Sequence, residues 1–290
     1  RMKSGRPKVV HSLGGKPLLA YVLETARRLK PKKLAVVVGH GAEEVKKECG
    51  DSAITWVHQK KQLGTGHALG CTGKIFEGFS GEVLILSGDV PLISKESLLG
   101  LLRCHREQNA VLTFVSASLA EPAGYGRVLR DDKGSLLGIV EERDASEKEK
   151  QIREINAGIY AASARFLFDA LKGLSNRNQQ GEYYLPDVVG MALKNGQTVG
   201  TVHAEDAREI LGINTREELA FMERTLQERI NRKWMESGVT FQDPQTTYIE
   251  EGVRIGQDTF IGPNTHLLGH TVIGARCRID GNAYVPTANL

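Results

Sequence analysis

A single carboxylate follows a short apolar run in the first third of the chain. Residues 83–86 are Val-Leu-Ile-Leu, which is typical of a buried parallel strand, and Gly88, Asp89 and Pro91 end that run. In open α/β sheets ligands bind beyond the carboxyl ends of the strands, so Asp89 is expected where a metal ion or a phosphate-bearing substrate would be met. The structural alternative is that Asp89 only caps the helix that follows.

A glycine-rich loop precedes this strand. Residues 59–68 are Gln-Lys-Lys-Gln-Leu-Gly-Thr-Gly-His-Ala. The glycines let a ligand approach the backbone, and a helix that opens near Gly66 would offer N–H groups to a base edge or a phosphate. The loop is neither the dinucleotide fingerprint nor the Walker phosphate loop, so neither NAD nor a Walker-type ATP site follows. His67 has no Ser or Cys nucleophile beside it, which favours packing over catalysis.

Alternating strands and helices must position these residues. Further strands are expected over 34–38, 54–57, 110–117, 136–140 and 154–162, and helices over 18–29, 42–49, 94–102, 163–173, 182–195 and 215–238. This alternation predicts an α/β domain with a mixed, mostly parallel sheet. Ser94 and Ser163 can cap helices, and the charged run 145–151 is expected to be a solvated helix face.

Composition limits the function classes. The 290 residues are 40% hydrophobic, and 38 basic against 35 acidic residues give a net charge of +3. This balance predicts no nucleic-acid partner and leaves local phosphate binding to particular lysines and arginines. Without a membrane-length apolar run or a signal peptide, no membrane partner and a cytoplasmic location are expected. The four cysteines form no Cys-x-x-Cys pair, which suggests neither a zinc site nor a disulfide framework.

The C-terminal part follows a different pattern. Branched apolar residues recur at every sixth position, at Ile249, Ile255, Ile261, Leu267, Ile273, Ile279 and Val285. This hexapeptide repeat predicts a parallel β-helix with about three repeats per coil. Because no polar capping repeat precedes Leu290, we expect that neighbouring subunits cover the coils or that the native protein continues.

Seven short motifs occur in a fixed order. They lie at 59–68, 88–92, 124–127, 139–141, 154–159, 180–184 and 212–214. Together they resemble the bacterial N-acetylglucosamine-1-phosphate uridyltransferase / glucosamine-1-phosphate acetyltransferase family, in its uridyltransferase half and the start of its left-handed β-helix. That family has a glycine-rich loop ending in Thr-Arg-Met before a Pro-Lys pair. Arg1 and Met2 resemble the end of that loop, so we expect further residues upstream.

The resemblance implies a domain plan and an activity. It implies a Rossmann-like nucleotidyltransferase domain over 1–214, a linker helix over 215–238 and a left-handed β-helix over 239–290. The implied reaction transfers uridylyl from UTP to N-acetylglucosamine 1-phosphate and releases pyrophosphate. In the family the β-helix trimerises and, over many more coils, forms an acetyl-CoA site. A homotrimer without acetyltransferase activity is therefore expected for residues 1–290.

The resemblance also assigns site residues. Arg1 and Lys8 would be catalytic and neutralise the triphosphate. The nucleotide would be bound by Gln59, Gly64, Thr65, Ser87, Gly88 and Asp89. The amino sugar would be bound by Gly126, Glu141, Asn156 and Asn214. The family usually has Tyr at the position of Ser87 and Thr at that of Ala157, so contacts of these two side chains are expected to differ here.

Asp89 and Asn214 are the expected ligands of a magnesium ion. Each follows an apolar stretch and offers an oxygen atom, the kind of ligand that Mg²⁺ prefers. Neither has a cysteine or paired histidines nearby to favour zinc.

Two alternative functions remain open. A related enzyme could activate another sugar or base, such as glucose 1-phosphate with dTTP, although Glu141 and Asn156 argue against it. A regulatory homologue could keep the fold without turnover, although the presence of Lys8, Asp89 and Asn214 disfavours it.

Overall fold

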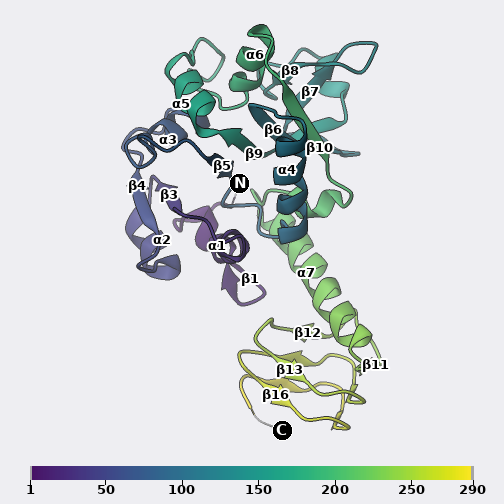
Figure 1. The fold of residues 1–290 in the computed structure, drawn as a ribbon. Helices are drawn as coiled ribbons and strands as arrows, with labels where there is room; N and C mark the ends of the chain where they lie inside the picture. Colours follow the sequence, from purple (N-terminus) through teal and green to yellow (C-terminus); the bar gives the residue numbers. More distant parts are fainter. Residues whose placement is uncertain (1, 289–290) are drawn as a thin grey trace. The chain divides into compact units, whose positions relative to one another are not determined.

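The computed structural model describes residues 2–288, which form two compact units (Figure 1). One unit is Leu19–Gly212, and the other combines the segment up to Leu18 with the chain from Ile213 onward. No helix within residues 2–288 is long and apolar enough to cross a membrane.

A six-stranded mixed sheet forms the centre of the Leu19–Gly212 unit. Its strands are β5 (Glu82–Ile85), β6 (Leu112–Ser118), β7 (Gly126–Arg130), β8 (Leu136–Val140), β9 (Glu154–Ser163) and β10 (Val199–His203). Their order is β10-β6-β9-β7-β8, and β5 also pairs with β9. A separate parallel pair joins β3 (Ala35–Val38) to β4 (Thr55–His58). The expected α/β class and mixed sheet are confirmed.

The direction of β9 determines how the strands pair. β5, β6, β7 and β10 run the same way, and β9 runs opposite to them between β6 on one side and β5 and β7 on the other. Within this sheet only the β10–β6 pair is parallel, and every pair that includes β9, and the β7–β8 pair, is antiparallel. The parallel strand expected at residues 83–86 was therefore wrong in its pairing, because β5 pairs antiparallel with β9. Apolarity alone could not predict this, because a buried strand has the same apolar run in either direction.

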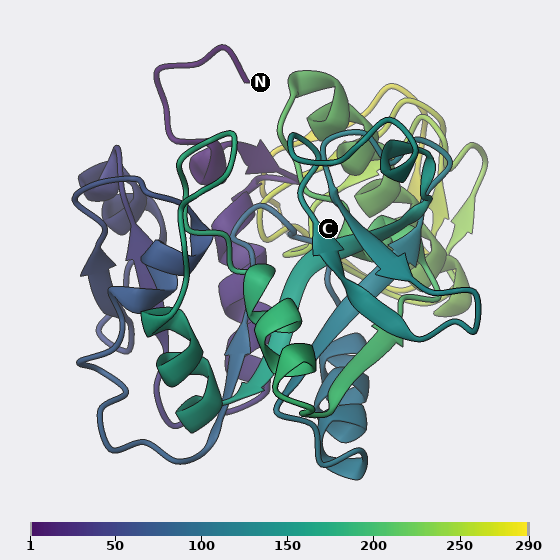
Figure 2. The ribbon, with the colours of Figure 1, turned by 90° about the horizontal axis from the view of Figure 1, so that it is seen from above.

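Side chains alternate between the two faces of the sheet, and both faces are buried because helices pack against each of them. Phe114 and Tyr160 belong to one apolar cluster with residues of α5 (Ala164–Lys172) and α6 (Asp187–Lys194). Val115 and Ile159 belong to a second cluster with residues of α4 (Lys95–Glu107). Figure 2 shows the strands with these helices on their two sides.

Three more α-helices lie in this unit. They are α1 (Leu18–Arg28), whose first residue lies at the unit boundary, α2 (Ala42–Cys49) and α3 (Thr65–Gly70). Ser94 and Ser163 cap α4 and α5 as predicted, by accepting hydrogen bonds from the N–H groups of Ser97 and Phe166.

Two helix predictions were wrong in extent. The charged run 145–151 is helical only in a 3₁₀ turn at Glu149–Gln151. The helix expected over 182–195 begins only at Asp187, because Pro186 is its N-cap and Tyr183, before it, bonds to the glycine-rich loop.

The second unit contains one long helix and the β-helix. Helix α7 (Arg216–Glu236) begins with a capping box made by Thr215 and Glu218. Seven two-residue strands then recur every six residues, from β12 (Tyr248–Ile249) to β18 (Tyr284–Val285). Tyr248 pairs with His266, and His266 with Tyr284, so each coil contains three repeats as predicted.

Small polar residues close the corners of the coils. Thr265 and Thr271 are fully buried, and each donates its hydroxyl to a backbone carbonyl at 2.8 Å. These bonds satisfy polar groups that would otherwise be costly to bury.

Candidate active site

The glycine-rich loop is held in one conformation by its own side chains and by Tyr183. Gln59 is buried, and its Nε2 lies 3.1 Å from the Gly64 carbonyl oxygen and 2.9 Å from His67 Nδ1. Gly64 has a φ of 99°, and a Cβ there would lie 2.6 Å from the Tyr183 carbonyl oxygen. The same carbonyl accepts a hydrogen bond from the Gly66 N–H at 2.8 Å. Glycine is therefore required at Gly64, and His67 contacts the side chain of Gln59 in this loop.

Thr65 fastens this loop to the segment before α6. Its Oγ1 accepts a hydrogen bond from the Leu185 N–H at 3.0 Å. The Thr65 hydroxyl is thus bonded within the domain, and the segment 182–185 supports the loop through hydrogen bonds of Tyr183 and Leu185.

The loop after β5 contains Ser87, Gly88 and Asp89. The Val90 N–H donates to the Ser87 carbonyl at 3.2 Å, and Ser87 Oγ donates to the Gly158 carbonyl at 3.3 Å. Asp89 does not cap α4, since Ser94 has that position. A capping role for Asp89 at α4 is therefore excluded.

Gly126, Glu141 and Asn156 come together, and we call them the polar cluster. Gly126 pairs with Asn156 across β7 and β9, and a Cβ on Gly126 would lie 3.7 Å from Glu141 Cδ. Glu141 directly follows β8, and Asn156 is 7% exposed. Backbone, carboxyl and amide groups thus converge from three neighbouring strands, which suits recognition of a polar ligand.

The carboxyl group of Glu141 has a raised pKa. Burial, reinforced by the negative charges of Asp187, Asp144 and Glu182, raises the pKa of Glu141 to about 7. Burial also raises the pKa of Asp187, and Asp144 adds to that rise. Glu141 is therefore divided between its two protonation states near neutral pH.

Arg127 and Glu142 support this cluster and were not identified from the sequence. The Arg127 side chain is 2% exposed and forms an ion pair with Glu142 at 2.7 Å. Arg127 also donates to the Tyr125 carbonyl, and Glu142 accepts a hydrogen bond from the Gly124 N–H at 3.2 Å. The motif at 124–127 was the available signal, but it did not reveal the partner.

Lys8 and Asn214 meet in the second unit. Lys8 begins the 3₁₀ turn Lys8–Val10, and its Nζ donates to Asn214 Oδ1 at 2.7 Å. The Asn214 N–H donates to Glu218, in the first turn of α7. Arg1 lies outside the described residues. Asp89 and Asn214 belong to different units.

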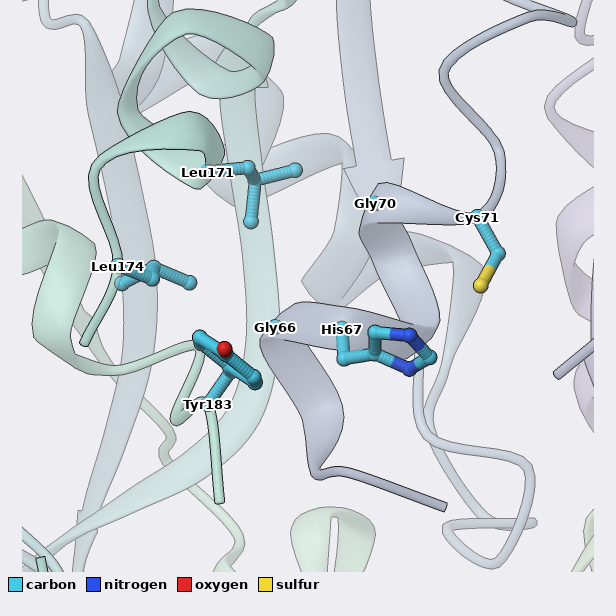
Figure 3. A pocket seen from close by; sticks show the side chains of 7 residues that line it. All are labelled: Gly66, His67, Gly70, Cys71, Leu171, Leu174 and Tyr183. Atoms are coloured by element: carbon cyan, nitrogen blue, oxygen red, sulfur yellow. The ribbon is translucent and has the colours of Figure 1, made fainter. Parts of the chain in front are cut away.

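Two further features of the described residues bear on ligands. Within residues 2–288 no three or more His, Cys, Asp and Glu side chains are grouped to hold a metal ion. A cavity of about 330 Å³ lies between α3 and α5 (Figure 3), where Leu171, Leu174 and Tyr183 line it with residues of α3. None of the residues assigned to a ligand lines this cavity.

Comparisons with known proteins support the expected resemblance. The MobA-like NTP transferase domain family matches residues 1–154, and the bacterial transferase hexapeptide family (six repeats) matches residues 252–287. The hexapeptide match and the parallel strands fit a left-handed β-helix.

Curated relatives extend the similarity over the whole chain. The bifunctional protein GlmU of Pelobacter propionicus is 46% identical over 100% of this chain and 63% of its own length. Those of Geobacter metallireducens and Caldanaerobacter subterraneus are 43% and 45% identical, over 100% and 98% of this chain and 61% and 62% of their own lengths. The resemblance to this bifunctional family is confirmed, and the chain spans less than two thirds of these relatives.

A solved structure supports the fold alone. A crystal structure of UDP-glucose pyrophosphorylase complexed with UDP-glucose has a TM-score of 0.56 and 15% identity, and the match covers 77% of this chain and 91% of that chain. Since the family match at residues 1–154 covers more than half of the 290 residues, the chain belongs to the MobA-like NTP transferase domain family.

Proposed function

We propose that this protein is a UDP-N-acetylglucosamine pyrophosphorylase that transfers uridylyl from UTP to N-acetylglucosamine 1-phosphate. Family membership supports a nucleoside triphosphate and a sugar phosphate as the substrate classes. The observation that carries the finer proposal is the convergence of Gly126, Glu141 and Asn156, which offers hydrogen-bonding groups for a sugar. The hydrogen-bonded loop at Gln59, Gly64 and Thr65 would bind the uracil.

The reaction needs no protein nucleophile. An oxygen of the sugar phosphate attacks the α-phosphorus of UTP in line, and the bond to the β-phosphate oxygen breaks as pyrophosphate leaves. The protein would act by holding both substrates in reach and by neutralising phosphate charge. Lys8 and Arg1 would supply positive charge at the triphosphate.

A divalent metal ion is implied by the family in general, and we propose Mg²⁺. Asp89 would supply a carboxylate oxygen and Asn214 an amide oxygen, the hard ligands that Mg²⁺ takes together with waters and phosphates. Lys8 donates to that amide oxygen. The metal would stabilise charge on the transferring phosphoryl group.

The assembly and its setting are also proposals. We propose a homotrimer through the β-helix, because its faces present Tyr248 at 39% and Tyr284 at 68% exposure. We further propose that the protein acts in the cytoplasm on small-molecule substrates, without nucleic-acid or membrane partners. Light scattering tests the trimer, and a monomer would contradict it.

A substrate panel tests the activity. Pyrophosphate release should be faster with UTP and N-acetylglucosamine 1-phosphate than with dTTP or glucose 1-phosphate, by at least about tenfold in kcat/KM, because a site built from hydrogen-bonding groups rejects an analogue that leaves them unpaired. Glu141→Ala is the matched variant, since it should weaken the discrimination between the two sugars. Equal kcat/KM for both sugar phosphates in the wild-type protein would contradict the proposed sugar.

A further inference from the structure

The side-chain amide of Asn156 is held at both ends. Its Nδ2 donates a hydrogen bond to Tyr160 Oη at 2.6 Å, and its Oδ1 accepts one from the Gly158 N–H at 3.1 Å. Tyr160 is 1% exposed, and its ring lies beside that of Phe114 in the core. A buried phenol therefore reaches a polar cluster that faces the proposed sugar site.

An irregularity in β9 makes this bond possible. Phe114 pairs with Tyr160 and Ser116 pairs with Asn156, so two steps along β6 correspond to four along β9. In a regular strand, residues four apart are separated by about 13 Å, too far for their side chains to bond. The bulge contains Gly158, whose φ of 70° favours glycine. The bulge thus brings Asn156 and Tyr160 together.

The pattern of bonds fixes the orientation of the amide. A backbone N–H can only donate, so Gly158 must face Oδ1, and this leaves Nδ2 toward the tyrosine hydroxyl. An amide has two donor hydrogens and two acceptor lone pairs. After the two internal bonds, Asn156 retains the capacity to donate one hydrogen bond and to accept one.

The tyrosine hydroxyl stays neutral in this environment. Burial raises the pKa of Tyr160, Glu141 and Asp187 raise it further, and the hydrogen bond from Asn156 opposes them. Glu141 follows β8, and Asp187 begins α6. The hydroxyl is therefore available to hold the amide at any pH at which the enzyme would work.

We propose that Tyr160 is a positioning residue, which holds the Asn156 amide so that one N–H and one lone pair face the sugar phosphate. This inference rests on the proposed function and deepens it. A sugar hydroxyl both donates and accepts, so it complements the remaining donor and acceptor of Asn156. Tyr160 is too buried to touch the substrate and acts through Asn156.

Tyr160→Phe tests the proposal, because it removes the hydroxyl and keeps the ring. We expect the KM for N-acetylglucosamine 1-phosphate to rise roughly fivefold to tenfold, as for the loss of about one neutral hydrogen bond, while the KM for UTP changes less than about twofold. Thr113→Val is the matched control. It removes a buried 3.0 Å contact between Thr113 and His105, which lies in α4 on the other face of the sheet, and should change neither KM.

A second measurement does not depend on any variant. In the ¹⁵N-labelled wild-type protein, one proton of the Asn156 side-chain amide should exchange slowly with solvent, because Tyr160 holds it. Rapid exchange of both protons would overturn the proposal, as would an unchanged KM for the sugar phosphate in a folded Tyr160→Phe protein. If the wild-type protein does not use UTP and N-acetylglucosamine 1-phosphate, the proposed function fails, and the exchange measurement still tests whether Tyr160 holds Asn156.

Discussion

Lys8 Nζ donates a hydrogen bond to Asn214 Oδ1 at 2.7 Å, although the two residues are 206 positions apart. Lys8 begins a 3₁₀ turn near the start of the chain, and Asn214 immediately precedes the N-cap of α7. The contact joins a cation expected at the triphosphate to an amide oxygen expected at the metal ion. It therefore identifies two residues whose roles should depend on each other.

Lys8→Met should lower kcat by about 10²-fold, because a positive charge aimed at the phosphates is lost. Its thermal stability should change little, since the bond is exposed. Lys172→Met is the control, because Lys172 pairs with Asp169 at 2.8 Å and is 76% exposed on α5. Steady-state pyrophosphate release measures both variants, and similar kcat values for the two would contradict the role of Lys8.

The raised pKa of Glu141 predicts how stability depends on pH. Because its pKa rises from 4.5 to about 7 on folding, the folded protein binds more protons than the unfolded chain between these values. The free energy of unfolding should therefore fall as pH rises from about 5 to 8, by on the order of 2 kcal/mol from this group. Glu141→Gln should reduce that fall, as measured by urea unfolding at several pH values. An identical pH dependence in the variant would exclude Glu141 as the cause.

The same group should affect binding of the sugar phosphate. The ionised carboxylate accepts stronger hydrogen bonds from sugar hydroxyls than the neutral acid does, so the KM should fall as pH rises through about 7. The substrate phosphate also titrates, and its contribution persists in Glu141→Gln. The difference between the two pH profiles isolates Glu141, and superimposable profiles would contradict its role.

Gly158→Ala should both destabilise the protein and weaken the site. Gly158 has a φ of 70°, and a Cβ there would lie 3.1 Å from Ser87 Oγ. An alanine in this left-handed conformation should cost about 1–2 kcal/mol of stability. Its Cβ should also displace β9 and with it Asn156, which should raise the KM for the sugar phosphate. Gly100→Ala is the control, because Gly100 lies within α4 with no atom within 4 Å of its added Cβ. Gly100→Ala should stabilise the helix by roughly 0.5–1 kcal/mol. A Gly158→Ala protein as stable as the wild type would contradict the expected backbone strain at position 158.

Local patterns in the sequence predicted the elements that local chemistry determines. The strands from β12 to β18 each need only a branched apolar residue at every sixth position, so Ile249 to Val285 were predicted correctly. The strand β11 (Thr240–Phe241), which pairs with β14, lies outside this spacing and was not predicted. Ser94 and Ser163 were identified as caps because a hydroxyl acts on the backbone three residues away. These signals need no knowledge of distant contacts.

Long-range contacts explain what the sequence did not reveal. The segment 182–185 was expected to be helical, but Tyr183 bonds to the glycine-rich loop and Leu185 to Thr65, over a hundred positions away in the chain. The hydrogen bond between Asn156 and Tyr160 depends on the bulge in the register between β6 and β9. Gly158 was the only local signal of that bulge, and a single glycine in a strand is weak evidence.

Asp89→Asn should cost mainly turnover if Asp89 binds the metal. The substitution keeps the shape of the side chain and removes its charge, so kcat should fall by about 10²-fold or more, and more Mg²⁺ should be needed for half-maximal rate. Asn214→Ala should act in the same direction but less, because a neutral ligand is lost, although it also removes the partner of Lys8. Asp169→Asn is the control, since Asp169 is an exposed carboxylate paired with Lys172. Magnesium titrations of pyrophosphate release compare the three, and near-wild-type magnesium-dependent turnover in a folded Asp89→Asn protein would rule out Asp89 as a ligand.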